Sequence, residues 1–363
     1  MAKHAYTITI NRLPSGRDPI EYTYRKTACT LTCSKAAASV SYTSSALKSF
    51  DDLISFRVDL VKDAMRKMYL LHAMRCGAAL KVRKVILTID GESREYGKDA
   101  PGFPFLYSML TSKDLALPES WKDRDFQSTV LTATKSATDN DLRFACLFSF
   151  LAGTGKQFEI ERFTCYWTAV NSHYNYLLEC SKPFYASSLG AADFASLSKR
   201  KQKDFSGDTV GLGAMVSLLQ CGGKLSSQGE RTTFRQQYGA VKSHLRHYSK
   251  DQLRTLAADL AAHRTDPGWF PEGPLGEHLR ECASRNGISA WGFLCLDYAY
   301  YMRCNYLHGS KTTILFTAAN DPELAAFRAL NILLGEYLKE VLPQMFRENW
   351  IGQAEYDRID AGL

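Results

Sequence analysis

Long apolar runs and a leader-like N-terminus are both missing from this sequence of 363 residues. No stretch of about 18 apolar residues occurs, so the sequence predicts no membrane-spanning helix. The opening decapeptide, MAKHAYTITI, lacks the apolar core of a signal peptide. We therefore expect a cytoplasmic protein without a membrane partner.

Paired metal-binding motifs are missing as well. None of the ten cysteines lies in a C-x2-C pair, and His244 and His247 form an H-x2-H pair with no cysteine pair beside it. Dispersed thiols in a chain without a signal peptide are usually reduced and packed as small hydrophobic groups. Cys29 and Cys33 alternate with Leu31 in a strand-like run and should share one face of it. We expect no metal and no other cofactor.

The composition is that of an ordinary folded protein, with 45% hydrophobic and 23% charged residues. The chain is long enough to bury a sizeable core and to form two domains. Its formal net charge of +7 suits a polyanionic partner, although many proteins that ignore nucleic acid are as basic.

The first part of the chain alternates β-branched and aromatic residues. Short antiparallel strands are predicted at residues 5–10, 21–25, 28–33 and 39–43, and a central strand at 81–90. One long helix is predicted between them, from Phe50 to His72, with His72 on its apolar stripe as a core histidine. We place this α+β domain at residues 1–125. It shows no catalytic constellation, so we expect it to sense, bind or dimerise.

From residue 126 to 345 the spacing of apolar residues becomes helical, which predicts an all-α bundle followed by a polar tail at 346–363. The fold class is therefore α+β: a mixed N-terminal domain with a helical domain after it. The helix at 158–178 carries polar groups that could face a pocket, namely Glu161, Arg162, Asn171 and His173. The last helix should begin with Asp321 as its cap and Pro322 in its first turn, and Pro343 should end it.

Two basic segments stand out. Lys199, Arg200 and Lys201 form a run that is either a solvated loop or a contact for RNA phosphates. In the helix around residues 231–248, basic residues recur on a face that differs from the apolar stripe: Arg231, Arg235, Lys242, Arg246 and Lys250. A helix lying along a phosphate backbone needs such a one-sided stripe, but plain solubility explains it as well. Arg235, Lys242 and Arg246 are our candidate RNA-binding residues on this helix.

The densest chemistry lies in the stretch DYAYYMRCNYLHGSK, which begins at Asp297. Residues 289–307 predict a helix that ends at His308, because Gly309 is a natural residue just beyond a helix end. Arg303 keeps its charge and can donate two parallel hydrogen bonds to phosphate oxygens. His308 is of a residue type that titrates near neutral pH and can take or give a proton. A step of five residues turns about 140° on a helix, so the two side chains converge only if the last turn unwinds or a second copy completes the site.

The segment R-C-N-Y-L-H-G, with a polar loop and an amphipathic helix after it, resembles the R-x4-6-H signature of the HEPN superfamily. These are small helical domains, many of them metal-independent ribonucleases of toxin, CRISPR and anti-phage systems, and they often pair two motifs across a dimer. The resemblance implies that Arg303 binds phosphate and that His308 transfers the proton at the ribose 2′-OH or at the leaving oxygen. Many active members carry Asn, Asp or His directly after the Arg, where this chain has Cys304. Asn305, one step on, joins the candidate catalytic residues, and Lys311 joins the candidate RNA-binding residues.

Two functions from different classes follow. The first is a metal-independent endoribonuclease, an effector of toxin or anti-phage type, acting as a homodimer or with a second motif-bearing or regulatory partner. The second is an inactive scaffold that binds RNA or a partner protein, with Cys304 marking a degraded site. A DNA-directed nuclease is disfavoured because DNA lacks the 2′-OH that this chemistry uses.

Overall fold

The computed structural model describes residues 3–11, 19–24, 26–34, 37–55, 58–77, 80, 82–97, 117–132, 137–156, 158–188, 215–216, 219–226, 228–233, 235–307 and 322–346. Of residues 137–141, 181–188, 228–229, 232, 307 and 322–323 it describes the backbone alone. The packing divides the chain into two compact units. The first consists mainly of Met1–Asn140 and the second of Asp141–Gly153 with Gln157–Met345.

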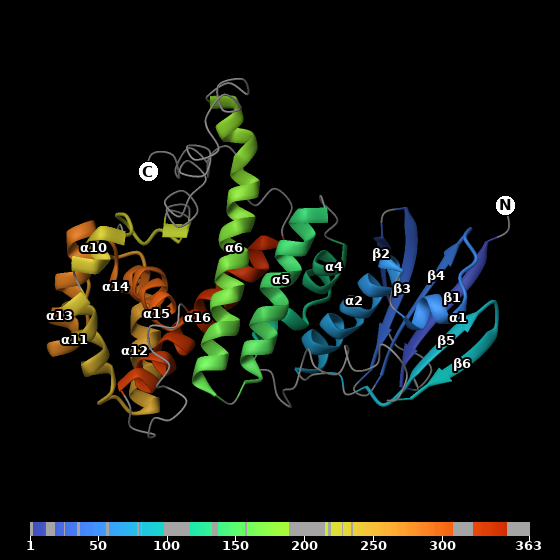
Figure 1. Ribbon diagram of the computed structural model, residues 1–363, viewed down its shortest axis with the longest axis horizontal. Coiled ribbons are helices and arrows are strands. Elements are labelled where there is room, and N and C mark those ends of the chain that lie inside the picture. The colour runs from blue at the N-terminus through green and yellow to red at the C-terminus, as the bar shows by residue number, and fades with distance from the viewer. Residues whose placement is uncertain are drawn as a thin grey trace. The chain divides into compact units, whose positions relative to one another are not determined.

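The first unit is built on a six-stranded antiparallel sheet (Figure 1) with the strand order β2-β3-β4-β1-β5-β6. The strands are β1 (His4–Ile10), β2 (Ile20–Tyr24), β3 (Thr27–Cys33), β4 (Ala38–Ser44), β5 (Val85–Ile89) and β6 (Glu92–Tyr96). The predicted strands are therefore present. β5 pairs with β1 on one side and with β6 on the other, so it is an interior strand of the sheet, as predicted. The edge strand β6 was not predicted, because four of its five residues are exposed.

One face of this sheet is apolar and buried. The register pairs Tyr6 with Tyr42 and Ile8 with both Val40 and Leu87, so buried residues line up across neighbouring strands. Helices cover this face in Figure 1: α1 (Phe50–Ile54) packs on β5, and α2 (Asp59–Cys76) packs on β3 and β4. The sheet is thus the one-sided kind that period-two patterning predicts.

The single long helix predicted from Phe50 to His72 is wrong, because two helices occupy that stretch. A capping box between Ser49 and Asp52 begins α1, and Val58 then takes an extended backbone conformation that starts α2 anew. His72 is 2% exposed, as expected of a core histidine.

The first unit extends beyond residue 125. A short 3-10 turn, η1 (Glu119–Lys122), leads into α4 (Arg124–Thr132), which packs on β2 and α2. Trp121 and Val130 are fully buried there, so these helical residues add to the core of the sheet unit.

The second unit is helical, which confirms the mixed α+β class of the chain. Its elements are α5 (Ala137–Thr154), α6 (Glu159–Ser188), α10 (Gln228–Thr233), α11 (Arg235–Leu245), α12 (Lys250–Ala262), α13 (Pro274–Ala283), η2 (Ser284–Asn286), α14 (Ala290–Gly292), η3 (Phe293–Tyr298), α15 (Ala299–Leu307) and α16 (Pro322–Met345).

Helix α16 is the centre of the helical unit, because α6, α11, α12 and η3 all pack against it. Its apolar stripe is buried along its length, and Phe327, Leu330, Leu334 and Leu338 are each 0% exposed. Pro343 does not end the helix as predicted, since α16 continues to Met345. A proline in the last turn of a helix removes one backbone hydrogen bond, and its effect is confined to that turn.

Two helical glycines give a matched test of this packing. A Cβ on Gly276 of α13 would coincide with the carbonyl oxygen of Pro271, whereas a Cβ on Gly239 of α11 would meet no atom within 4 Å. We expect Gly276→Ala to lower the free energy of unfolding by about 3 kcal/mol or more. Gly239→Ala should raise it by about 0.5–1 kcal/mol, because alanine loses less backbone entropy in a helix. Urea unfolding of both variants measures this, and equal effects would contradict the packing.

Candidate functional site

The stretch that carries the candidate catalytic residues is one continuous helical rod, residues 290–307, called the motif helix below. Ser289 caps its start by accepting a hydrogen bond from the backbone of Gly292. The helix then passes through α14, the π-helical segment η3 and α15. Helical structure over this stretch was predicted, but the π-helical segment was not. Such segments often occur at functional sites.

A buried ion pair fixes the π-helical segment. Asp297 is 0% exposed, and its carboxylate accepts a hydrogen bond from Arg231 Nε at 2.6 Å and another from the backbone N–H of Ser226 at 3.2 Å. The guanidinium of Arg231 also lies over the ring of Tyr300, at 4.6 Å. Arg231 was predicted to belong to an exposed basic stripe. The structure instead places it in this pair, where 11% of its side chain is exposed.

The last turn of the motif helix presents Arg303, Cys304 and Asn305, all half-buried. The Nη1 atom of Arg303 donates to Cys304 Sγ at 3.8 Å, and the side-chain amide of Asn305 donates to the carbonyl oxygen of Tyr301 at 3.0 Å. Both predicted polar groups therefore have contacts within their own helix. His308 and Lys311 lie outside the described residues, as do Lys199, Arg200 and Lys201.

Aromatic contacts brace the motif helix on two sides. Tyr300 meets Trp167 of α6 edge to face, with ring centroids 6.0 Å apart. Tyr306, three residues after Arg303, meets the ring of Phe327 on α16 at 4.7 Å, and Phe327 in turn meets Phe163 of α6 at 4.9 Å. The turn that bears Arg303 is thus held between two long helices.

Beside this aromatic stack, α6 and α16 share a polar cluster around Glu159. Its carboxylate accepts a hydrogen bond from Asn331 at 2.8 Å and pairs with Arg162 and Arg328, each at 3.5 Å. Arg162, which the sequence predicted as a polar group of this helix, therefore belongs to a charged cluster between α6 and α16.

The other polar residues predicted for that helix do not form a site. His173 is 1% exposed and its Nδ1 lies 2.7 Å from the hydroxyl of Tyr337, while burial lowers its pKa to about 3. It is therefore a neutral core histidine at physiological pH. Glu161 and Asn171 are exposed.

The predicted basic face of α11 is present in part. Arg235, Lys242 and Arg246, called the basic row below, are seven and four residues apart, which returns them to within about 40° of one direction on a helix. Arg235 and Arg246 are exposed, and Gly239 between them faces open space. On the neighbouring face of α11, Tyr238 is 1% exposed.

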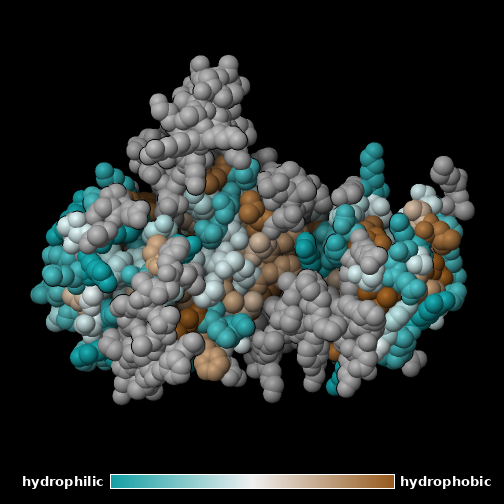
Figure 2. All heavy atoms as spheres, in the orientation of Figure 1, coloured by the Kyte–Doolittle hydropathy of each residue, from teal (hydrophilic) through white to brown (hydrophobic). Residues whose placement is uncertain are grey.

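The ring of Tyr238 joins α11 to the motif helix. It contacts the rings of Phe293, Tyr298 and Tyr301, with centroid distances of 5.5, 6.1 and 4.7 Å. The helix with the basic row therefore packs directly on the helix that carries Arg303. Figure 2 shows a mainly hydrophilic surface over α11 and α13.

Three histidines gather where α11 ends. The rings of His244 and His278 have centroids 4.8 Å apart, and Arg246 Nε donates to His247 Nε2 at 3.0 Å. Burial and then the neighbouring His278 and His247 lower the pKa of His244. The ring of Trp269 stacks on that of His263, with centroids 4.1 Å apart, and so holds its loop against the end of α12.

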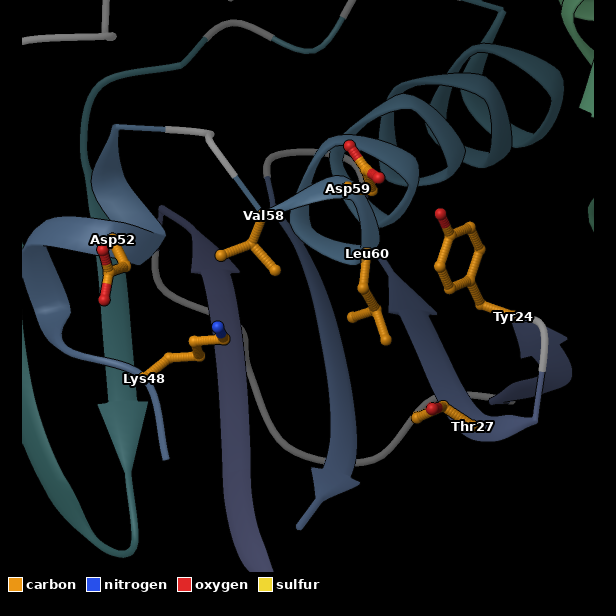
Figure 3. A pocket seen from close by; sticks show the side chains of 7 residues that line it. All are labelled: Tyr24, Thr27, Lys48, Asp52, Val58, Asp59 and Leu60. Atoms are coloured by element: carbon orange, nitrogen blue, oxygen red, sulfur yellow. The ribbon is translucent and has the colours of Figure 1, made fainter. Parts of the chain in front are cut away.

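The first unit has a hollow of about 450 Å³ between the β2–β3 turn and the two helices α1 and α2. Figure 3 shows Lys48, Val58 and Leu60 pointing toward it, with Tyr24 on its other side. Its lining includes two carboxylates, those of Asp52 and Asp59, but no histidine. This composition offers no base that titrates near neutral pH.

Three comparisons with known proteins found no match for this chain, whether to family models, to curated proteins or to solved structures. In the part of the chain that the structure describes, no three His, Cys, Asp or Glu side chains are grouped so that they could hold a metal ion. Within the same residues, no helix is long and apolar enough to cross a membrane.

Sequence reasoning missed the Asp297–Arg231 pair, although one signal was present. Asp297 is the only charged residue between Ser289 and Met302, and a lone acid in an apolar helix needs a buried partner. Its partner lies 66 residues earlier, so spacing along the chain could not identify it.

Removing the carboxylate charge tests the buried pair. Asp297→Asn leaves the guanidinium of Arg231 buried without its counter-charge, so the free energy of unfolding should fall by about 3–5 kcal/mol. The double variant Asp297→Asn/Arg231→Met should recover part of this loss. As a control, Asp251→Asn breaks the exposed pair with Arg254 and should cost less than about 1 kcal/mol. An Asp297→Asn protein as stable as this control would refute the assignment.

Proposed function

We propose that this protein is a metal-independent endoribonuclease of the HEPN type, an effector in bacterial toxin or anti-phage immunity. The observation that carries the proposal is the packing of two helices. Arg303 lies half-exposed in the last turn of the motif helix, and α11, which bears the basic row, packs on that same helix through Tyr238. Arg303, the proposed catalytic residue, and the basic row, the proposed phosphate-binding surface, thus lie on two helices that pack against each other.

The chemistry follows from the residue types. The ribose 2′-OH attacks the adjacent phosphorus, a new P–O bond forms, and the 5′-oxygen of the next nucleotide leaves. His308, which directly follows Leu307 in the sequence, takes the proton from the 2′-OH or gives one to the leaving oxygen. Arg303 stabilises the charge that builds on the phosphoryl oxygens in the transition state. The products carry a 2′,3′-cyclic phosphate and a free 5′-OH.

The basic row supplies binding rather than chemistry. Arg235 and Arg246 are exposed, and no side chain of Gly239 stands between them and a phosphate backbone. Phosphate contacts of this kind release counterions and act on any RNA sequence. The helical unit would act as a homodimer or with a second motif-bearing or regulatory partner, because one Arg303–His308 step does not bring both side chains to one face of an ideal helix.

A second candidate function is an RNA-binding or protein-binding scaffold without catalysis. The contacts within the last turn favour it: Arg303 donates to Cys304, and the amide of Asn305 donates to Tyr301. In that case the basic row would still bind RNA, and Arg303 would serve packing alone.

Cleavage of total RNA and tRNA by the purified protein in EDTA tests the first function. The wild type should cut and leave cyclic phosphate ends, while Arg303→Ala and His308→Ala should each lose about 100-fold or more of the rate. Arg254→Ala, which removes an exposed arginine of α12, is the matched control and should cut normally. Cleavage that survives in Arg303→Ala/His308→Ala would refute the mechanism. No cleavage at high protein, with RNA binding intact and no toxicity on expression, would favour the scaffold.

The basic row has its own test in the salt dependence of RNA binding. Arg235→Ala/Lys242→Ala/Arg246→Ala should weaken binding of single-stranded RNA and lower the log–log salt slope by about 2, at roughly 0.7 per phosphate contact. A control variant removes three other exposed charges of the helical unit, Lys224, Arg254 and Arg285, and changes the net charge equally. Equal losses in both variants would show that net charge, rather than the row, governs binding.

A further inference from the structure

Two thiols of the first unit converge on one backbone oxygen. Cys33 is the last residue of β3, and Cys76 is the last residue of α2. Both Sγ atoms lie 3.8 Å from the carbonyl oxygen of Ser34, so the two sulfurs are no more than twice that distance apart.

Their environments differ in the way that a reactive pair requires. Cys33 is 3% exposed, and Cys76 is half-exposed at the end of its helix. The adjacent thiol of Cys33 lowers the pKa of Cys76 below its usual range, and the neighbouring His72 and Arg75 lower it further, while burial opposes them. The adjacent Cys76 and burial raise the pKa of Cys33. Both the greater exposure and the direction of these shifts favour Cys76 as the thiol that ionises first.

Packing fixes the basic residues beside Cys76. His72 precedes Cys76 by one helical turn and is 2% exposed. Arg75 Nε donates to the side-chain oxygen of Gln127 on α4 at 3.0 Å, and the amide of Gln127 donates to the carbonyl oxygen of Trp121 at 3.2 Å. Helix α4 thus positions a guanidinium beside the thiolate, an arrangement that marks reactive cysteines.

We propose that Cys76 and Cys33 form a hydroperoxide-reactive dithiol, in which Cys76 is oxidised first and Cys33 resolves it to a disulfide. The Cys76 thiolate attacks one peroxide oxygen, an S–O bond forms, the O–O bond breaks, and the leaving oxygen takes a proton to become water or an alcohol. The sulfur of Cys33 then attacks that of Cys76, the S–S bond forms, and the S–O bond breaks to release water. The two thiols lose two electrons, which reduce one peroxide.

The product would join the end of β3 to the end of α2 and so tie the covering helix to the sheet. This inference does not rest on the ribonuclease proposal, because every residue that it uses lies in the first unit. It also agrees with the expectation that the thiols are reduced at rest, since disulfides of reducing compartments are usually transient and redox-sensing.

Peptide mapping of the full-length protein tests the site. The reduced protein is treated with one equivalent of hydrogen peroxide, alkylated and digested without reductant. We expect a Cys33–Cys76 linked peptide, loss of two of the ten free thiols, and reversal by dithiothreitol. Cys33→Ser should instead leave a sulfenic acid on Cys76 that dimedone traps, and Cys76→Ser should abolish both products. Cys165→Ser, at another half-exposed thiol, should change neither. Oxidation of Cys76 no faster than that of Cys165 would overturn the proposal.

The positioning role of Arg75 has a separate readout. The alkylation rate of Cys76 by iodoacetamide should stay high at acidic pH, where ordinary thiols are protonated and unreactive. Arg75→Gln should move the midpoint of this profile toward that of an ordinary cysteine without abolishing the reaction. A profile that matches ordinary cysteine in the wild type, or one that Arg75→Gln leaves unchanged, would refute this role.

Discussion

The helical unit depends on the burial of one carboxylate. Asp297 is fully enclosed, and such a charge is tolerated only when its hydrogen bonds are made inside the protein. Arg231 and the backbone of Ser226 make those bonds, which fix the segment before α11 against the motif helix. Arg231 then continues the connection by covering the ring of Tyr300, whose other contact is Trp167 of α6. The Asp297–Arg231 ion pair therefore holds α10 against the motif helix and, through Tyr300 and Trp167, connects both to α6.

The same constraint joins the two parts of the candidate site. Because the π-helical segment packs all six of its residues inside, the motif helix is fixed along its first half, and its partly exposed side chains lie from Tyr300 onward. Tyr238 lies against that buried half, so α11 is placed by the core rather than by its charges. The basic row therefore belongs to a helix that the core of the unit already holds in position. In the proposed function, such a preformed surface would lose little conformational entropy on binding RNA.

The sequence predicted what depends on neighbours along the chain and missed what depends on distant partners. Alternation revealed β1, β3 and β4, and apolar stripes revealed α6 and α16, because each pattern repeats within a few residues. The edge strand β6 was missed because its exposed side chains carry no apolar period. Arg231 was assigned to a solvent-facing stripe, since spacing on its own helix cannot reveal a carboxylate that meets it from another helix. The thiol pair shows the same limit: Cys33 was placed on the correct face of its strand, but Cys76 approaches it from α2.

Cys304 is where the sequence departs from the HEPN pattern that it resembles, and its contact with Arg303 bears on the proposed function. Sulfur is a weak hydrogen-bond acceptor, and at 3.8 Å its contact with Arg303 is long. A phosphate oxygen offers the same guanidinium a charge-assisted bond that is roughly twice as strong as a neutral one, in the two-pronged form that arginine favours. In the proposed function, substrate phosphate would displace the sulfur at small cost, whereas an acidic neighbour such as Asp would compete with phosphate for the same charge. The proposed phosphate binding by Arg303 would then not require the polar residue that many HEPN proteins carry after the arginine.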